Sequence, residues 1–172
     1  MMSLIQYKLF NTDIAEYISH FPCPYFKGVY SSDNIPHFTD NFILVCNLSN
    51  FNEIGTHFIT LAKLDGELIF FDSLALNWVN NNLKTYINKV AANSISVLNN
   101  AIQPIQSHGC GAYCIFFVLF YHAVVLKCIP NDLISFTDTN NITNDDICIK
   151  NVDLLSLSLI LQNGYRTKGA EL

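Results

Sequence analysis

Four side chains in this sequence have the chemical types needed to transfer an acyl group through a thioester. Cys110 supplies a thiol, His57 an imidazole that could take up its proton, and Asp72 a carboxylate that could orient the ring. Gln103 carries an amide that, with the backbone N–H of Cys110, could donate hydrogen bonds to an oxyanion. We therefore predict a catalytic site made of His57, Asp72, Gln103 and Cys110.

The residues around Cys110 suggest how its thiol could become a nucleophile. Gly109 and Gly111 permit a tight turn, and the apolar run that starts at Ala112 predicts a buried helix ending at Lys127. A thiol at the first turn of a helix faces unpaired N–H groups and the positive end of the helix dipole, which favour the thiolate. The alternative is that Cys110 is a small core residue, as free cysteines usually are.

The base and the acid are expected to meet at one end of a β-hairpin. Asp65-Gly66 separates the apolar runs 57–64 and 67–72, and such a pair is a strong signal for a two-residue turn. The register of that turn pairs the last residue of the first run with the first residue of the second. His57 and Asp72 then become diagonal neighbours on one face of the hairpin, within side-chain reach.

The remaining sequence predicts a single domain spanning residues 1–172, with no repeat or linker and enough length for a sizeable core. Helical spacing and caps indicate a helix at 11–20 that starts on an Asn or Thr cap, and another at about 76–90. Other patterns predict a loop or irregular strand at 26–33, strands at 41–47 and 94–98, a surface loop at 137–146, a last helix from about 153 to 161 and a frayed tail from Gly164.

Composition narrows the classes of partner. The formal charge of −5 and the pI near 5.3 argue against nucleic acid, which requires clustered Lys and Arg. Because 51% of the residues are hydrophobic and only 13% are charged, we expect a partner such as a peptide to cover some apolar surface. The long apolar helix is better explained as a packed central helix than as a membrane span.

The cysteines and the N-terminus indicate a reducing compartment. We find no positive region followed by a long apolar one at the start of the chain, so we expect an intracellular rather than a secreted protein. The six cysteines are then expected to be free thiols, at positions 23, 46, 110, 114, 128 and 148. Zinc is the alternative for His108, Cys110 and Cys114, but no Cys-x-x-Cys pair completes a site, and we expect no metal.

Taken together, these motifs resemble those of one protease family. Gly55-Thr56-His57, Phe71-Asp72-Ser73 and Gln103-x-x-x-Ser107-x-x-Cys110-Gly111 are similar to the motifs of adenain-type cysteine proteases. That family comprises the adenovirus maturation protease and its relatives in other double-stranded DNA viruses, virophages and virus-like transposons. It also resembles the SUMO-specific and related ubiquitin-like-protein proteases. The resemblance implies an α+β fold of the papain-like superfamily, with a small twisted mixed sheet packed on a central helix that begins at the nucleophile.

The resemblance also implies an activity and its setting. His57 matches the family's base, Asp72 its acid, Cys110 its nucleophile and Gln103 its oxyanion donor. The expected function is a cysteine endopeptidase that cleaves after small, Gly-type residues and processes capsid or core precursor proteins during virion maturation. It would act in the cytoplasm or nucleus of the host cell and in the virion. The family implies no cofactor beyond a possible activating peptide.

Departures from the family pattern refine these expectations. Phe58 follows the base where the family commonly has Trp, so an aromatic wall is kept. Gln103 lies seven residues before Cys110, and Gly109 precedes it directly. Ubiquitin-like-protein proteases tend to have Gln six residues before the cysteine and Asp directly before it, so the viral type is favoured. We expect Phe58, His108 and Gly109 to border the substrate cleft.

Four alternatives stay open at this point. Gln106 is a rival oxyanion donor, although it lies close to Cys110 along the chain. The same triad could remove ubiquitin-like modifiers from proteins, or it could serve an acyltransferase. The chain could also be an inactive scaffold whose apolar surface binds partners.

Overall fold

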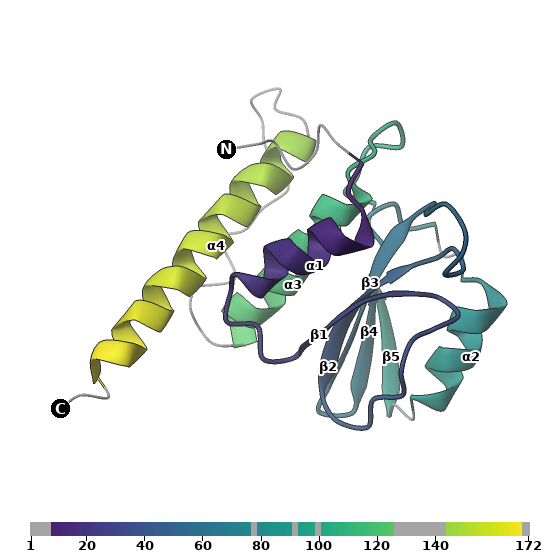
Figure 1. Ribbon diagram of the computed structural model, residues 1–172, viewed down its shortest axis with the longest axis horizontal. Coiled ribbons are helices and arrows are strands. Elements are labelled where there is room, and N and C mark those ends of the chain that lie inside the picture. Colours follow the sequence, from purple (N-terminus) through teal and green to yellow (C-terminus); the bar gives the residue numbers. More distant parts are fainter. Residues whose placement is uncertain (1–7, 77–78, 91–92, 99–100, 126–143, 170–172) are drawn as a thin grey trace.

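The computed structural model describes residues 8–76, 79–90, 93–98, 101–125 and 144–169. Within these ranges the chain is a mixed α/β structure with a five-stranded sheet and helices on both faces (Figure 1). The strands are β1 (Phe26–Ser31), β2 (Phe42–Asn47), β3 (Phe58–Leu64), β4 (Glu67–Phe71) and β5 (Ser94–Leu98). The helices are α1 (Asn11–Ser19), α2 (Asn81–Lys89), α3 (Cys110–Val125) and α4 (Asn144–Gly169).

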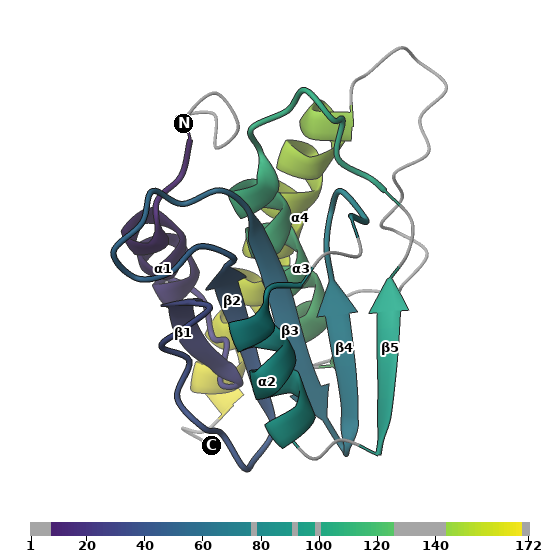
Figure 2. The same ribbon diagram turned by 90° about the vertical axis from the view of Figure 1, so that its right-hand side faces the viewer.

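The strands lie side by side in the order in which they occur along the chain (Figure 2). β1 pairs in parallel with β2 and β4 pairs in parallel with β5, while β2–β3 and β3–β4 are antiparallel. The predicted hairpin is confirmed, because Leu64 pairs with Glu67 and Thr60 with Phe71. Asp65 and Gly66 have φ values of 50° and 87°, as a two-residue turn that follows the strand twist requires.

α3 is the central helix of the molecule. It packs between the sheet and α4, with α1 beside it on the same face of the sheet (Figure 1). Val118 and Leu119 are fully buried, and the Phe117 ring stacks on Phe71 of β4 with 4.5 Å between ring centroids. The predicted buried helix is therefore confirmed to Val125, whereas its expected end lies outside the described residues. No helix in the described ranges is long and apolar enough to cross a bilayer.

α2 covers the opposite face of the sheet, in the connection between the parallel strands β4 and β5 (Figure 1). Its Leu83 is fully buried in a second core. The expected start near residue 76 is wrong, because Asn80 precedes the helix in an extended conformation and its side chain accepts the N–H of Leu83 at 2.9 Å. The apolar residues before Asn80 continued the helical spacing, but the cap decides where the helix begins.

α1 occupies the predicted range, but its N-terminus is capped differently. Phe10 is the residue that precedes the helix, and the carboxylate of Asp13 accepts its backbone N–H at 2.8 Å. The expected Asn or Thr cap is therefore wrong. An acidic residue in the first turn serves the same purpose, since it satisfies an N–H and lies near the positive end of the helix dipole.

α4 differs most from expectation. It begins at Asn144, so the described end of the expected loop is helical, while residues 137–143 lie outside the described ranges. The helix starts before the expected residue 153 and continues to Gly169, through the tail that was expected to fray. Asp145 and Asp146 favour turns in isolation, yet they occupy the first helical turn, where carboxylates interact favourably with the dipole.

Candidate active site

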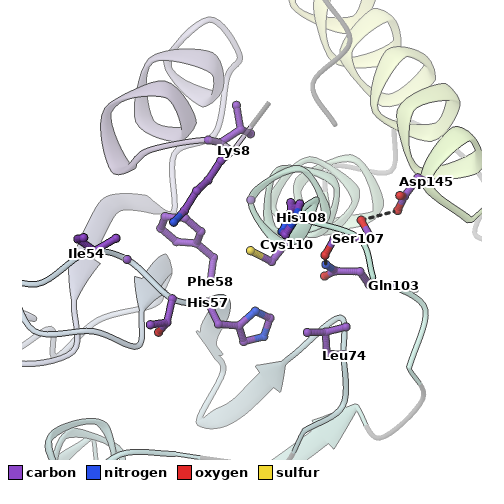
Figure 3. Close-up of a pocket in the computed structure, with 14 residues that line it drawn as sticks. Lys8, Ile54, His57, Phe58, Leu74, Gln103, Ser107, His108, Cys110 and Asp145 are labelled. Atoms are coloured by element: carbon purple, nitrogen blue, oxygen red, sulfur yellow. Dashed lines mark hydrogen bonds between the residues drawn. The ribbon is translucent and has the colours of Figure 1, made fainter. Parts of the chain in front are cut away.

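A cleft of about 810 Å³ opens where β3 begins, β4 ends and α3 begins. Its lining includes His57, Phe58, Gln103 and Cys110, which come from separate segments of the chain (Figure 3). The hairpin delivers His57 and Asp72 to this end of the sheet. Cys110 reaches the same end of the sheet from α3, in the helix layer that packs on one face of the sheet.

Asp72 is held firmly in position. Its side chain lies directly after β4 with only 2% of its surface exposed, and its Oδ1 is 2.7 Å from Nε2 of His57. The backbone N–H groups of Leu74 and Leu76 donate to the same carboxylate at 2.9 and 3.1 Å. Burial by itself would raise the pKa of Asp72, but these hydrogen bonds outweigh it and lower the pKa. Asp72 is therefore a fixed carboxylate.

The imidazole of His57 lies between Asp72 and the sulfur of Cys110. It is 8% exposed, and this burial alone would lower its pKa. The hydrogen bond with Asp72 and the interaction with the Cys110 side chain oppose that effect and raise the pKa of His57 to about 9. Because Nε2 faces Asp72, Nδ1 is the ring nitrogen left to exchange a proton with the thiol.

Cys110 is the first residue of α3, as predicted, and its side chain is partly exposed to the cleft. Its sulfur points toward the end of the sheet where His57 and Phe58 lie (Figure 3). The N–H groups of a first helical turn have no acceptor within the helix, so the Cys110 N–H is directed out of the helix end. That geometry suits a thiolate and a nearby oxyanion donor.

The side chain of Gln103 is fixed at both of its amide atoms. Ser73 donates its hydroxyl hydrogen to Oε1 at 2.6 Å, and Nε2 donates to the backbone oxygen of Ser107 at 2.9 Å. Only 4% of Gln103 is exposed, and it lines the cleft beside Cys110. Because an amide nitrogen carries two hydrogens, one N–H stays available to the cleft. Gln106, the rival donor, is exposed and does not line the cleft.

The residues predicted to border a substrate fall into two groups. Phe58 and His108 line the cleft, with Phe58 also packed into the core beneath it. Gly109 does not line the cleft. It is buried, and its backbone N–H donates to the hydroxyl of Ser107 at 3.0 Å, so it shapes the loop before the nucleophile.

Several cleft residues were missed from sequence. Lys8 and Ile54 contribute one wall, while Ser107 and Asp145 contribute the opposite one (Figure 3). Leu9 also lines the cleft. Ser107 belongs to the motif around Cys110, which is the one signal that could have found it. Ile54 directly precedes the Gly55-Thr56-His57 motif. Lys8, Leu9 and Asp145 carry no local pattern, because only the tertiary fold brings them to the cleft.

Comparison with known proteins adds no identification. No protein-family model matches the chain. No curated protein matches it either. The chemistry of the cleft is therefore argued from its geometry.

The other described cysteines differ from Cys110 in their surroundings. Burial raises the pKa of the Cys23 and Cys46 thiols to about 12 and raises the pKa of Cys114 and Cys148 as well. These thiols are therefore protonated and poorly nucleophilic near neutral pH. Within the described part of the chain, no group of three or more His, Cys, Asp or Glu side chains could hold a metal ion.

Proposed function

We propose that this chain is a cysteine endopeptidase that uses Cys110 as nucleophile, His57 as general base and Asp72 as the residue that orients the ring. One observation carries the proposal. A buried carboxylate contacts an imidazole at 2.7 Å, and the other side of that imidazole interacts with a cysteine at the start of a helix, on the wall of an open cleft. This is the geometry by which a thiol is activated for covalent catalysis.

In the first half of the reaction, the thiol proton has passed to Nδ1 of His57, and the resulting thiolate of Cys110 attacks the carbonyl carbon of the substrate. The carbonyl oxygen becomes an oxyanion that accepts hydrogen bonds from the backbone N–H of Cys110 and from Gln103. His57 then gives its proton to the departing amine, and the acyl group stays on the sulfur as a thioester.

In the second half, water replaces the departed amine. His57 takes a proton from this water, whose oxygen attacks the thioester carbon. A second oxyanion collapses to release the carboxylic acid and to return the proton to the sulfur. Asp72 stays ionised throughout and stabilises the imidazolium each time it forms, consistent with its lowered pKa.

The substrate class is proposed from the resemblance described above. An adenain-type enzyme of the papain-like superfamily would cleave after small, Gly-type residues in viral capsid or core precursors during virion maturation. The mixed sheet packed on a central helix that begins at Cys110 supports this assignment, because it is the arrangement that the resemblance implies.

The experiment begins with the thiol itself. The protein is treated with iodoacetamide at neutral pH, and labelled cysteines are identified by mass spectrometry. Cys110 should react faster than free cysteine, whereas the half-buried Cys23 should react slowly because of its raised pKa. The enzymatic proposal fails if no thiol reacts faster than free cysteine and Cys110→Ala leaves every activity unchanged. Cys23→Ala is the matched control.

The substrate is then identified by products. The protein is incubated with the structural proteins encoded by its own genome, and new N-termini are mapped. Cleavage after small residues, lost in Cys110→Ala and kept in Cys23→Ala, is the expected result. Preferred cleavage of a Gly-Gly modifier fusion would instead indicate a ubiquitin-like-protein peptidase. Acyl transfer from a coenzyme A thioester without peptide cleavage would indicate an acyltransferase.

A further inference from the structure

We propose that Asp145, at the start of α4, is a positioning residue that holds the two oxyanion donors of the cleft in place through Ser107. The inference rests on the proposed peptidase function and deepens it. Asp145 is 38 residues beyond Ser107 in sequence, yet its carboxylate accepts the Ser107 hydroxyl at 3.0 Å (Figure 3).

Ser107 contacts both parts of the proposed oxyanion site, the side chain of Gln103 and the backbone directly before Cys110. Its backbone oxygen accepts a hydrogen bond from Nε2 of Gln103 at 2.9 Å, which fixes the side-chain donor. Its hydroxyl oxygen accepts the backbone N–H of Gly109 at 3.0 Å, which fixes the residue directly before the Cys110 donor. Since that hydroxyl receives a hydrogen from Gly109, its own hydrogen is directed to Asp145.

Asp145 is itself anchored from a second direction. The hydroxyl of Tyr113, one turn into α3, lies 3.0 Å from the same carboxylate oxygen that Ser107 contacts. The Tyr113 hydroxyl also lies 3.3 Å from the backbone oxygen of Ile102, the neighbour of Gln103. One oxygen of the Asp145 carboxylate is therefore within hydrogen-bond distance of two hydroxyl groups, that of Ser107 in the loop and that of Tyr113 in α3.

The chemical consequence concerns the transition state. Oxyanion donors are effective only when they are preorganised, and loss of one donor typically lowers kcat by about 100-fold to 1000-fold. Without an acceptor at position 145, Ser107 loses the contact that fixes its hydroxyl, and both donors lose a common support. The effect should fall on kcat rather than on KM, because the oxyanion exists only after attack.

The test compares two variants of Asp145 in the full chain with a fluorogenic peptide amide ending in Gly-Gly. Asp145→Ala removes the acceptor and should lower kcat about 10-fold or more while KM changes less than about twofold. Asp145→Asn keeps a carbonyl oxygen for both hydroxyls and should stay within about threefold of the wild type. Asp153→Ala, which removes an exposed carboxylate from the same helix, should match the wild type.

A second measurement separates positioning from general damage. Alkylation of Cys110 by iodoacetamide displaces iodide and forms no oxyanion, so its rate reports on the activation of the thiol and not on the stabilisation of an oxyanion. Asp145→Ala should keep the wild-type alkylation rate within about twofold. Ser107→Ala should lower kcat similarly, and the double variant should be no worse than the more damaged single variant, because both changes break the same support.

Three results would overturn the inference. An unchanged kcat in Asp145→Ala would show that the contact does not matter for the reaction. A parallel fall in the alkylation rate would show that the substitution damages the whole site. An Asp145→Asn variant as impaired as Asp145→Ala would assign the effect to charge. If the wild type itself cleaves no peptide, the proposed function fails and the positioning role fails with it.

Discussion

At the scale of single residues, the imidazole of His57 is shared between two partners of different kinds. Nε2 faces the fixed carboxylate of Asp72 at 2.7 Å, while the other nitrogen is left for the sulfur of Cys110. A ring that stays protonated to about pH 9 places a positive charge beside the sulfur at neutral pH. Positive charge next to a thiol favours the thiolate, which is the reactive form.

This sharing predicts how the reactivity of Cys110 depends on pH. In His57→Ala the neighbouring cation is removed, so the rate of alkylation at pH 6 to 7 should fall about 10-fold or more and should recover as the pH rises. The measurement is the iodoacetamide rate between pH 5 and 10. His37→Ala is the control, because His37 is exposed and does not line the cleft. An identical pH profile in His57→Ala would contradict the assigned role.

The sequence allowed the principal side chains of the site to be predicted, but not their supports. His57 and Asp72 follow from a hairpin whose two-residue turn dictates the register, and Cys110 from its place before an apolar helix. The contacts of Ser73 with Gln103 and of Asp145 with Ser107 join segments that are distant in sequence. Ser73 and Ser107 stand within the motifs, but nothing local shows which partners they contact, and nothing local distinguishes Asp145 from a solvated polar residue.

At the scale of elements, the side chain of Asn80 joins the N-terminus of α2 to the end of the sheet. Asn80 accepts the N–H of Leu83 through its Oδ1. Its Nδ2 lies 2.6 Å from both the Ser32 hydroxyl and the backbone oxygen of Leu48, which follows β2. The cap therefore also fixes where α2 rests against the ends of two strands.

Loss of this cap should weaken the whole fold. Asn80→Ala removes the capping acceptor and the shorter of two hydrogen bonds to the Leu48 oxygen, so the free energy of unfolding should fall by about 1 to 2 kcal/mol. Urea denaturation measures this change in the free energy of unfolding. Asn81→Ala changes an exposed neighbour and should stay within about 0.5 kcal/mol of the wild type. Equal effects in the two variants would refute the capping role.

Prediction of elements succeeded where a local signal was unambiguous. The β3–β4 hairpin and β5 were located correctly, since turn chemistry and β-branched runs specify them without help from the rest of the chain. The start of α4 was missed because Asn and Asp favour both turns and the first turn of a helix. Only the packing of α4 against α3 selects the helical alternative.

At the scale of the whole molecule, the buried His57–Asp72 pair makes stability depend on pH. The pKa of His57 is raised from 6.5 to about 9, so its contribution is fully present below about pH 6.5 and is lost as the pH rises through about 9. The pKa of Asp72 is lowered, so its contribution is present above the unfolded value of about 4 and is lost as the pH falls below it. The pair therefore stabilises the fold most between these limits.

The expected result is a stability difference that depends on pH. The free energy of unfolding of the wild type relative to His57→Gln should be largest between about pH 5 and 6.5 and should shrink by pH 10, because the unfolded chain has already lost its imidazole proton. Urea midpoints at several pH values measure this difference. A difference that is constant from pH 5 to pH 10 would show that the folded and unfolded states bind the same protons at this position.

The position of the cleft has a consequence for the timing of activity during biosynthesis. His57 and Asp72 belong to the two strands of one hairpin or directly adjoin them, whereas Cys110 begins α3, which follows the whole sheet in the sequence. A nascent chain still emerging from the ribosome would thus contain the base and its carboxylate but no competent nucleophile. If the chain is the proposed peptidase, its triad is therefore complete only after residue 110 has been synthesised and α3 has packed against the sheet.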